Sequence, residues 1–145
     1  MRMNFVPFKR VGIFQLDDDV KKYSDVLSRY FYESIDEYGN EYFHVGDDDT
    51  IDDTHFLQVK DGKIRSIFCY EELIYKNVNL IGMTLTEFKE ITNADYVGEI
   101  YESDIFDDEP PMYDYEFKEI GLTVRMHYDR VHDITVSGHW IYENA

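Results

Sequence analysis

Residues 57–68 read LQVKDGKIRSIF. Apolar and polar residues alternate on both sides of Asp61-Gly62, as they do on strands that bury one face. Asp-Gly between two such runs is a strong signal for a two-residue hairpin turn, because both residues accept the positive φ angles that this turn needs. The stretch therefore predicts an antiparallel hairpin.

A second stretch, residues 124–135, reads VRMHYDRVHDIT and follows the first at a constant offset of 67 residues. The offset places Leu57 with Val124 and Ile67 with Ile134. We expect its turn at Asp129-Arg130, which is a weaker hairpin signal than Asp-Gly. The two stretches predict a pair of similar hairpins and an internal repeat.

The same offset relates two expected helix starts. Asp17 and Thr84 are both good N-cap residues. Residues 84–87, TLTE, also form a capping box, in which the glutamate reaches back to the N-cap amide. Apolar residues then recur at every third or fourth position, which predicts one helix after Asp17 and a shorter one that ends near Asn93.

Segments rich in aromatic and β-branched residues follow each expected helix. Together they predict an α+β fold: two tandem α-β-β-β-β units, about residues 11–72 and 78–140, within one domain of residues 1–145. We expect the strands to form an antiparallel sheet packed against the helices. The predicted strands are residues 30–34, 41–45, 55–60 and 63–70 in the first unit and 96–101, 112–118, 122–128 and 131–137 in the second.

This arrangement resembles the tandem-repeat architecture of the β-lactamase inhibitory protein family. Its single repeat also resembles the small outer-membrane assembly lipoproteins, whose repeats open with Gly-Met-Thr-x-x-Glu and close with a hairpin of the Asp-Gly-Lys-Val type. Residues 82–88, GMTLTEF, match the opening, and residues 61–64, DGKI, match the close. The inhibitor family is disulfide-bonded, whereas Cys69 is the single cysteine here. The resemblance therefore concerns the architecture and not the target.

The composition favours a folded, strongly acidic protein. There are 31 acidic and 14 basic residues, a net charge of −17, together with 13 tyrosines and 10 phenylalanines. Disordered acidic segments are poor in aromatic residues, so we expect a folded chain. The charge repels nucleic acid and anionic membranes, and it favours a basic partner. We find no signal peptide and no apolar run long enough to span a membrane, which predicts a cytoplasmic protein.

The acidic run at residues 44–53, HVGDDDTIDD, raises the question of a metal site. A calcium loop of the EF-hand type that begins at Asp47 needs Asp or Asn at position 51, Gly at 52 and Glu at 58. The chain has Ile51, Asp52 and Gln58 instead, so we expect no specific metal ion. The sequence also lacks HExxH, GxSxG and a glycine-rich phosphate loop. We therefore predict no enzyme, no catalytic residue and no cofactor.

Acidic residues and tyrosines alternate through residues 99–116, around the stiff pair Pro110-Pro111. Protein interfaces are enriched in tyrosine at their centre, while charges at the rim steer association. We predict that this segment and the acidic run form the partner-binding residues. These are Asp47, Asp48, Asp49, Asp52, Asp53, Tyr101, Asp104, Asp107, Asp108, Glu109, Tyr113, Asp114 and Tyr115.

The profile as a whole resembles the small acidic immunity proteins of polymorphic and contact-dependent toxin systems. That resemblance implies a cytoplasmic inhibitor that binds a cognate protein toxin, of the cationic nuclease type, in a heterodimer and blocks its active or substrate-binding site. The alternative is a nucleic-acid mimic that acts on a DNA-binding protein, such as an anti-restriction factor or an adaptor. An enzyme that uses paired carboxylates is a third and less favoured hypothesis.

Overall fold

The two expected hairpins form the centre of the molecule. The computed structural model describes residues 2–29, 36–46, 52–104 and 108–144, with the backbone alone for residues 28–29 and 52–54. The first hairpin joins β6 (Asp52–Lys60) to β7 (Lys63–Cys69), and the second joins β12 (Leu122–His127) to β13 (Arg130–Ser137). The four strands lie where the alternating pattern predicts them, so this part of the prediction is confirmed.

The two hairpins share one pairing pattern at the offset of 67 residues. Each also contains one irregularity of register, and the same offset relates the two positions, after Gln58 in the first hairpin and after Arg125 in the second. The corresponding pairs are Leu57–Ile67 with Val124–Ile134, and Lys60–Lys63 with His127–Arg130.

The second hairpin turns one residue earlier than the sequence pattern predicts. Its two-residue loop is Tyr128-Asp129, so the prediction of Asp129-Arg130 is wrong. Both loop residues have positive φ in each hairpin: 55° and 76° at Asp61 and Gly62, and 52° and 61° at Tyr128 and Asp129. These angles match the twist of the flanking strands. Glycine and aspartate accept them readily, whereas a tyrosine there is uncommon.

The hairpins lie side by side in one eight-stranded antiparallel sheet. The other strands of this sheet are β4 (Leu27–Arg29), β5 (Asn40–Val45), β10 (Tyr101–Ser103) and β11 (Met112–Phe117). The order across the sheet is β10-β11-β12-β13-β7-β6-β5-β4, so β7 and β13 pair at its centre and β10 and β4 form its edges. Among the described residues the fold is therefore mostly antiparallel sheet, with two short α-helices, and belongs to the α+β class.

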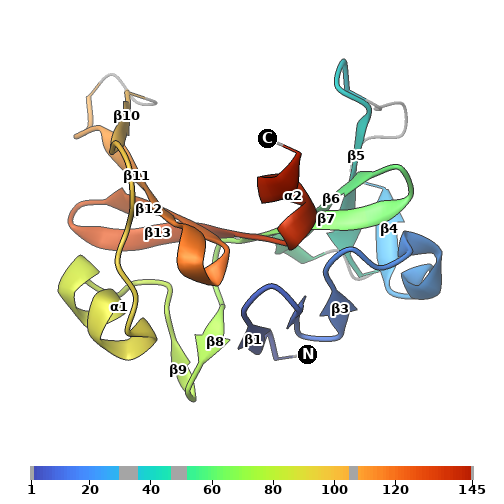
Figure 1. The fold of residues 1–145 in the computed structure, drawn as a ribbon, viewed down its shortest axis with the longest axis horizontal. Helices are drawn as coiled ribbons and strands as arrows, with labels where there is room; N and C mark the ends of the chain where they lie inside the picture. Colours follow the sequence, from blue (N-terminus) through green and yellow to red (C-terminus); the bar gives the residue numbers. More distant parts are fainter. Residues whose placement is uncertain (1, 30–35, 47–51, 105–107, 145) are drawn as a thin grey trace.

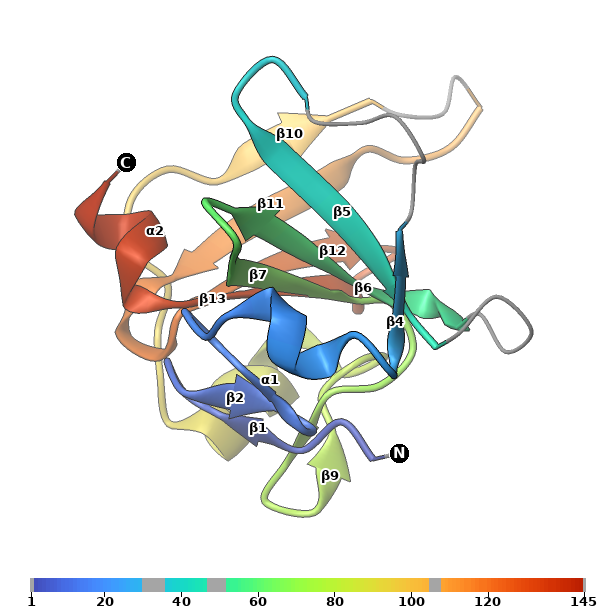
Figure 2. The same ribbon diagram turned by 90° about the vertical axis from the view of Figure 1, so that its right-hand side faces the viewer.

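Smaller elements cover one face of the large sheet. They are β1 (Phe5–Val6), β2 (Arg10–Val11), β3 (Phe14–Gln15), β8 (Ile74–Tyr75), β9 (Val78–Asn79) and α1 (Leu85–Thr92). Two 3₁₀ turns, η1 (Val20–Tyr23) and η2 (Lys118–Ile120), and a short helix, α2 (His139–Glu143), complete the chain. Figures 1 and 2 show α1, the β8–β9 hairpin and β1–β3 on one side of the sheet and α2 on the other. The sheet curves toward α2 at both ends (Figure 1).

The core lies between the sheet and the layer that contains α1. Apolar side chains of β6, β7, β12 and β13 point to this side, where they meet Phe14, Leu80 and Phe88 from the smaller elements. Burying one such side chain stabilises the fold by about 1.5–3 kcal/mol. The opposite face of the sheet lies toward α2, where Trp140 packs on the guanidinium of Arg65 at 4.2 Å from the ring centre. This face also carries aromatic residues: the ring of Phe56 packs against Phe68 and Tyr70, with ring centres 5.0 and 5.4 Å apart.

Helix α1 begins and ends as the sequence predicts. Thr84 is its N-cap and forms the expected capping box with Glu87: each backbone N–H donates to the other residue's side chain, both at 3.2 Å. Asn93 ends the helix in a left-handed conformation, with a φ of 51°. Phe88 is fully buried and packs edge-on against Phe117, with ring centres 4.7 Å apart. These contacts fix the start of α1 beside β11.

The helix predicted after Asp17 does not form. The 3₁₀ turn η1 occupies four residues there, with Asp19 as its N-cap, and the chain then enters β4. Asp17 has a φ of 64° and receives a hydrogen bond of 3.0 Å from Arg65 instead of capping a helix. The whole of the predicted strand at residues 30–34 lies outside the described residues, and the strand predicted at residues 96–101 is replaced by a shorter β10.

Candidate protein-binding site

Acidic and aromatic residues gather where β10 pairs with β11 at one edge of the sheet. Between positions 96 and 120 the sequence has nine acidic residues and one basic residue, Lys118. Isolated exposed apolar residues are normal on proteins, but a concentration of them marks a candidate interaction surface. Five of the eight exposed large apolar or tyrosine side chains among the described residues lie in this part of the fold: Val97, Ile100, Tyr101, Tyr113 and Tyr128.

Strand geometry decides which of the predicted residues face one another. Residues opposite each other in neighbouring strands point to the same face, and consecutive residues point to opposite faces. Glu102, Tyr113 and Met126 form one row across three strands, and Met126 belongs to the core. Glu102 and Tyr113 therefore face the α1 side of the sheet. Tyr101 and Asp114 form the next row and face the α2 side.

Tyr115 has a structural environment on the α1 side. Its ring packs edge-on against Tyr96, with ring centres 4.9 Å apart, and it packs against the core. Burial raises the pKa of the Tyr115 hydroxyl, and the neighbouring hydroxyls of Tyr96 and Tyr113 raise it further. Tyr113 is 38% exposed at the same face. Of the two predicted tyrosines on β11, Tyr113 is the more exposed to a partner on this face.

Asp114 is engaged inside the fold. Its carboxylate accepts a hydrogen bond of 3.0 Å from Nε of Arg125, and this bond raises the pKa of the Arg125 guanidinium by stabilising its charged form. Asp133 is buried on the same face and lies 2.7 Å from Nδ1 of His132. Burial raises the pKa of Asp133, although His132 and Arg125 partly oppose that shift. Asp114 and Asp133 are therefore both engaged with neighbouring side chains on the α2 side and contribute little to the attraction of a partner.

A pocket of about 680 Å³ opens on the α1 side of the β10–β11 edge. Its walls come from the first turn of α1, from β10 and β11, and from the Tyr128-Asp129 turn. The side chains that decide its chemistry are Ile100, Glu102, Tyr113, Tyr115, Tyr128 and Asp129. The volume falls in the range of about 300–1,000 Å³ that is typical of ligand sites. We call this feature the tyrosine pocket.

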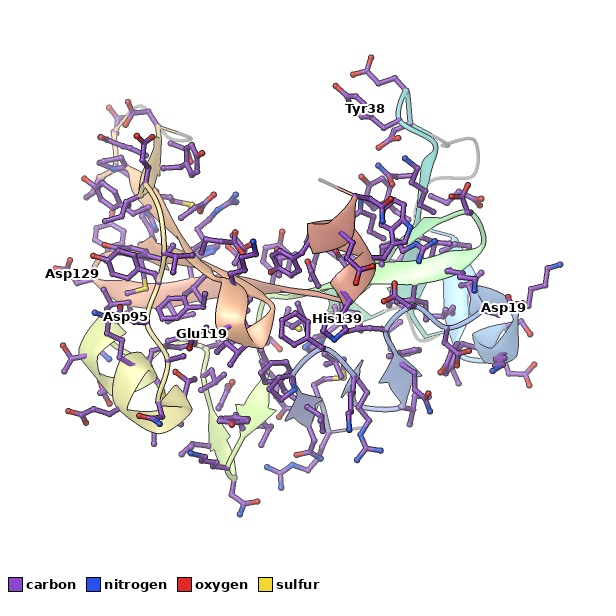
Figure 3. All side chains as sticks on the ribbon, in the orientation of Figure 1. Asp19, Tyr38, Asp95, Glu119, Asp129 and His139 are labelled. Carbon is purple, nitrogen blue, oxygen red and sulfur yellow. The ribbon has the colours of Figure 1, made fainter. Side chains whose placement is uncertain are left out.

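The tyrosine pocket is acidic as well as aromatic. Glu102 and Asp129 contribute two carboxylates, and no lysine or arginine belongs to its described lining. Figure 3 shows Asp129 at one end of the long axis of the molecule, with Asp19 at the other. Glu109, from the predicted acidic loop, adds a third carboxylate near the pocket, because it lies 3.7 Å from Nε2 of His127, a residue of the lining. The site can therefore attract positive charge and offer ring faces to it.

The other predicted residues fall into two groups. Asp104, Asp108 and Glu109 are exposed beside the pocket, as an acidic rim requires. Asp47, Asp48, Asp49 and Asp107 lie outside the described residues, and so do the side chains of Asp52 and Asp53 at the start of β6.

The described backbone of Asp52 and Asp53, at the start of β6, does not belong to the lining of the tyrosine pocket. In the sheet order β6 and β11 are separated by β7, β13 and β12, which makes four strand spacings, or about 19 Å. No residue of β6 belongs to the described lining of the pocket.

Sequence reasoning missed Tyr128, Asp129, Ile100 and Glu102 as members of the site. The missed signal is Tyr128 itself, a large aromatic residue where a hairpin turn favours glycine or asparagine. A residue held at positive φ costs of the order of 1 kcal/mol or more, and such positions cluster at functional sites. Tyr128 is 61% exposed, so its ring adds little to the core.

Among the described residues, no group of three or more His, Cys, Asp or Glu side chains is arranged to hold a metal ion. Cys69 is fully buried in the core. Within the described ranges, no helix has both the length and the apolar character needed to cross a membrane.

Comparison of the chain with protein-family models, with curated proteins and with solved structures found no match.

Proposed function

We propose that the protein is an immunity protein, which binds a cognate basic toxin of the nuclease type and neutralises it. The observation that supports this proposal most strongly is the tyrosine pocket, where exposed rings and carboxylates lie together at the β10–β11 edge of the sheet. Neutralisation follows if the bound protein covers the active or substrate-binding site of the toxin. The role is one of binding in a cytoplasmic heterodimer, without catalysis or a cofactor.

Charge and aromatic surface have separate tasks in this proposal. A net charge of −17 accelerates encounter with a cationic protein, from the usual rate constants of about 10⁵–10⁶ M⁻¹s⁻¹ toward about 10⁸ M⁻¹s⁻¹ at low salt. Exposed carboxylates at the rim, such as Asp108, mainly set this association rate. Tyrosine rings that become buried at the centre of the interface set the dissociation rate, as aromatic hot spots do.

A nuclease is a suitable target for such a surface. A site that binds a phosphate backbone is lined by lysine and arginine. The carboxylates of the β10–β11 edge would meet those same side chains, so that the inhibitor and the substrate compete for one set of cations.

The alternative, a nucleic-acid mimic, finds less support. A mimic needs a long row of free carboxylates, since duplex DNA carries one charge per about 1.7 Å of its axis. On the α2 face, two described acids of β11 are held by contacts inside the fold: Asp114 is paired with Arg125, and Glu116 accepts hydrogen bonds from the hydroxyls of Thr123 and Tyr142. Binding to DNA-binding proteins without sequence or toxin preference would favour the mimic.

The proposal also includes the tandem architecture, with units of about residues 11–72 and 78–140 arranged as in the β-lactamase inhibitory protein family. The shared pairing pattern of the two hairpins, including the irregularity of register, supports it. The first unit departs from it, because the 3₁₀ turn η1 stands where the second unit has helix α1.

The test is neutralisation of a toxin encoded beside this protein. The toxin domain is induced in bacteria with and without the protein, and growth is followed. We expect growth only when both are present, a 1:1 complex on size exclusion with light scattering, and stoichiometric loss of nuclease activity in the purified complex. If the toxin kills equally fast in both strains, the proposal is wrong.

Matched variants locate the binding surface in the same assay. Tyr113→Ala removes a ring of the tyrosine pocket, and Tyr38→Ala removes a 69% exposed tyrosine at the opposite end of the fold (Figure 3). We expect Tyr113→Ala to weaken protection and Tyr38→Ala to leave it unchanged. Equal effects of the two changes would place the binding surface elsewhere.

A further inference from the structure

We propose that the tyrosine pocket is the seat for one arginine side chain of the partner, together with the short loop that carries it. This inference rests on the proposed function, because it names the chemistry by which the same surface recognises a basic protein. The occupant is defined by three features of the pocket: two carboxylates, several tyrosine ring faces, and a volume of about 680 Å³ that one side chain alone would not fill.

The charges around the pocket favour a cation. Glu102 and Asp129 are the charged members of its described lining, and both are acidic. Of the basic residues nearby, Lys89 forms an ion pair of 3.0 Å with Asp95, and Arg130 donates to the carbonyl of Gly82 at 3.0 Å, a contact that leaves its positive charge in place. The described lining itself contains two carboxylates and neither lysine nor arginine.

The first turn of α1 does not convert the pocket into an anion site. Helix N-termini attract anions through their free N–H groups and the helix dipole. Here the Glu87 carboxylate already occupies that position, since it accepts from both the backbone N–H and the hydroxyl of Thr84, at 3.2 and 2.9 Å. An incoming phosphate would also meet the carboxylates of Glu102 and Asp129.

Arginine fits this site better than lysine or an apolar side chain. Its planar guanidinium stacks on aromatic faces and forms paired hydrogen bonds with a carboxylate, whereas lysine presents a compact, strongly hydrated charge. Tyr113 and Tyr128 are both substantially exposed at the pocket, so their ring faces are accessible to such a group. An apolar side chain would fill the space but leave Glu102 and Asp129 without a partner.

The arginine seat can be tested on the protein alone. The isotope-labelled chain is titrated with N-acetyl-arginine methylamide, with the lysine analogue, and with N-acetyl-citrulline methylamide, which keeps the shape of arginine but is neutral. We expect the arginine probe to shift the amide signals of Glu102, Tyr113 and Tyr128, with a dissociation constant on the order of 1 mM. The lysine probe should bind about three-fold more weakly, and the citrulline probe should not bind.

Variants distinguish the seat from general attraction to an acidic protein. Glu102→Gln, and separately Tyr113→Leu, should each weaken the arginine probe about three-fold or more. The matched controls Glu37→Gln and Tyr38→Leu change exposed residues at the far end of the sheet and should have no effect. Equal binding of arginine and citrulline, or equal loss in the control variants, would overturn the inference.

The two proposals can fail separately. If the arginine probe binds as described but no toxin is neutralised, the immunity function is wrong while the pocket chemistry stands. If a toxin is neutralised but its complex leaves the signals of Glu102, Tyr113 and Tyr128 unchanged, the arginine seat is wrong and the immunity function stands.

Discussion

Two neighbouring tyrosines of β11 should separate folding from binding. Tyr113 and Tyr115 both point to the α1 side of the sheet, because they are two residues apart on one strand. Tyr115 packs on Tyr96 and the core, whereas Tyr113 is 38% exposed in the tyrosine pocket. We expect Tyr115→Ala to reduce stability and Tyr113→Ala to reduce partner binding.

The size of each effect follows from these environments. Removing a fully buried aromatic ring costs roughly 3–5 kcal/mol, so we expect about 2–3 kcal/mol for the half-buried Tyr115, including its edge-on contact with Tyr96. That loss lowers the melting temperature by about 6–12 °C in a chain of this length. Tyr113→Ala should change stability by less than about 1 kcal/mol. It should weaken the toxin complex by about 2 kcal/mol or more, which is roughly 30-fold in affinity.

Urea unfolding measures the stability of each variant, and surface-based kinetics with the cognate toxin measure the affinity of each. We expect Tyr115→Ala to be the more destabilising change in urea, and Tyr113→Ala to be the change that weakens toxin binding more. This expectation is refuted if Tyr113→Ala is the more destabilising change, or if Tyr115→Ala weakens binding more than Tyr113→Ala does in a range of urea where both are folded.

Three further predictions concern other parts of the molecule. Asp47→Asn, Asp48→Asn and Asp49→Asn together should slow association with the toxin and flatten its salt dependence, with dissociation nearly unchanged in stopped-flow kinetics; a faster dissociation would contradict this. Thr84→Ala should cost about 1 kcal/mol in urea unfolding, because it removes the capping box of α1, and an unchanged midpoint would refute that role. Burial raises the pKa of Asp133, so the wild type loses stability from this group as pH rises through the folded-state pKa. The unfolding free energy of Asp133→Asn relative to wild type should therefore increase from about pH 3 to about pH 7, and a flat or falling difference would count against the assignment.

The centre of the fold could be predicted from the sequence because local and tertiary signals agree there. Alternation of apolar residues, the Asp61-Gly62 turn and the Thr84 capping box each correspond to an element of the structure. The helix predicted after Asp17 failed because the apolar spacing of Val20 and Tyr23 was its main support. Valine, serine, aspartate and tyrosine are weak helix formers, and Leu27 instead pairs with Val45 at the edge of the sheet.

The strand predicted at residues 96–101 failed for a local reason. Gly98 has a φ of 76°, which interrupts an extended strand, and Tyr96 packs against Tyr115 before that point. The chain therefore pairs with β11 only from Tyr101 onward, apart from one hydrogen bond of 2.9 Å from Val97 to Glu116.

The candidate site could be located from the sequence only in part. The density of acids and tyrosines around Tyr113 points to the β10–β11 edge, where the tyrosine pocket lies. Along β11 the side chains alternate, so Asp114 lies on the opposite face of the sheet from Tyr113 and Tyr115. The composition of the segment alone does not distinguish these faces. Tyr128 and Asp129 reach the pocket through a turn that is distant in sequence, and their contribution depends on the pairing of β12 with β11.

The most direct test of the binding surface is hydrogen exchange of the complex with the cognate toxin, followed by mass spectrometry. The toxin should protect backbone amides of residues 96–104 and of the Tyr128-Asp129 turn, while β4 and β5 at the opposite edge exchange as in the free protein. Protection confined to β4, β5 or α2, with residues 96–104 unchanged, would contradict the assignment of the β10–β11 edge as the partner-binding surface.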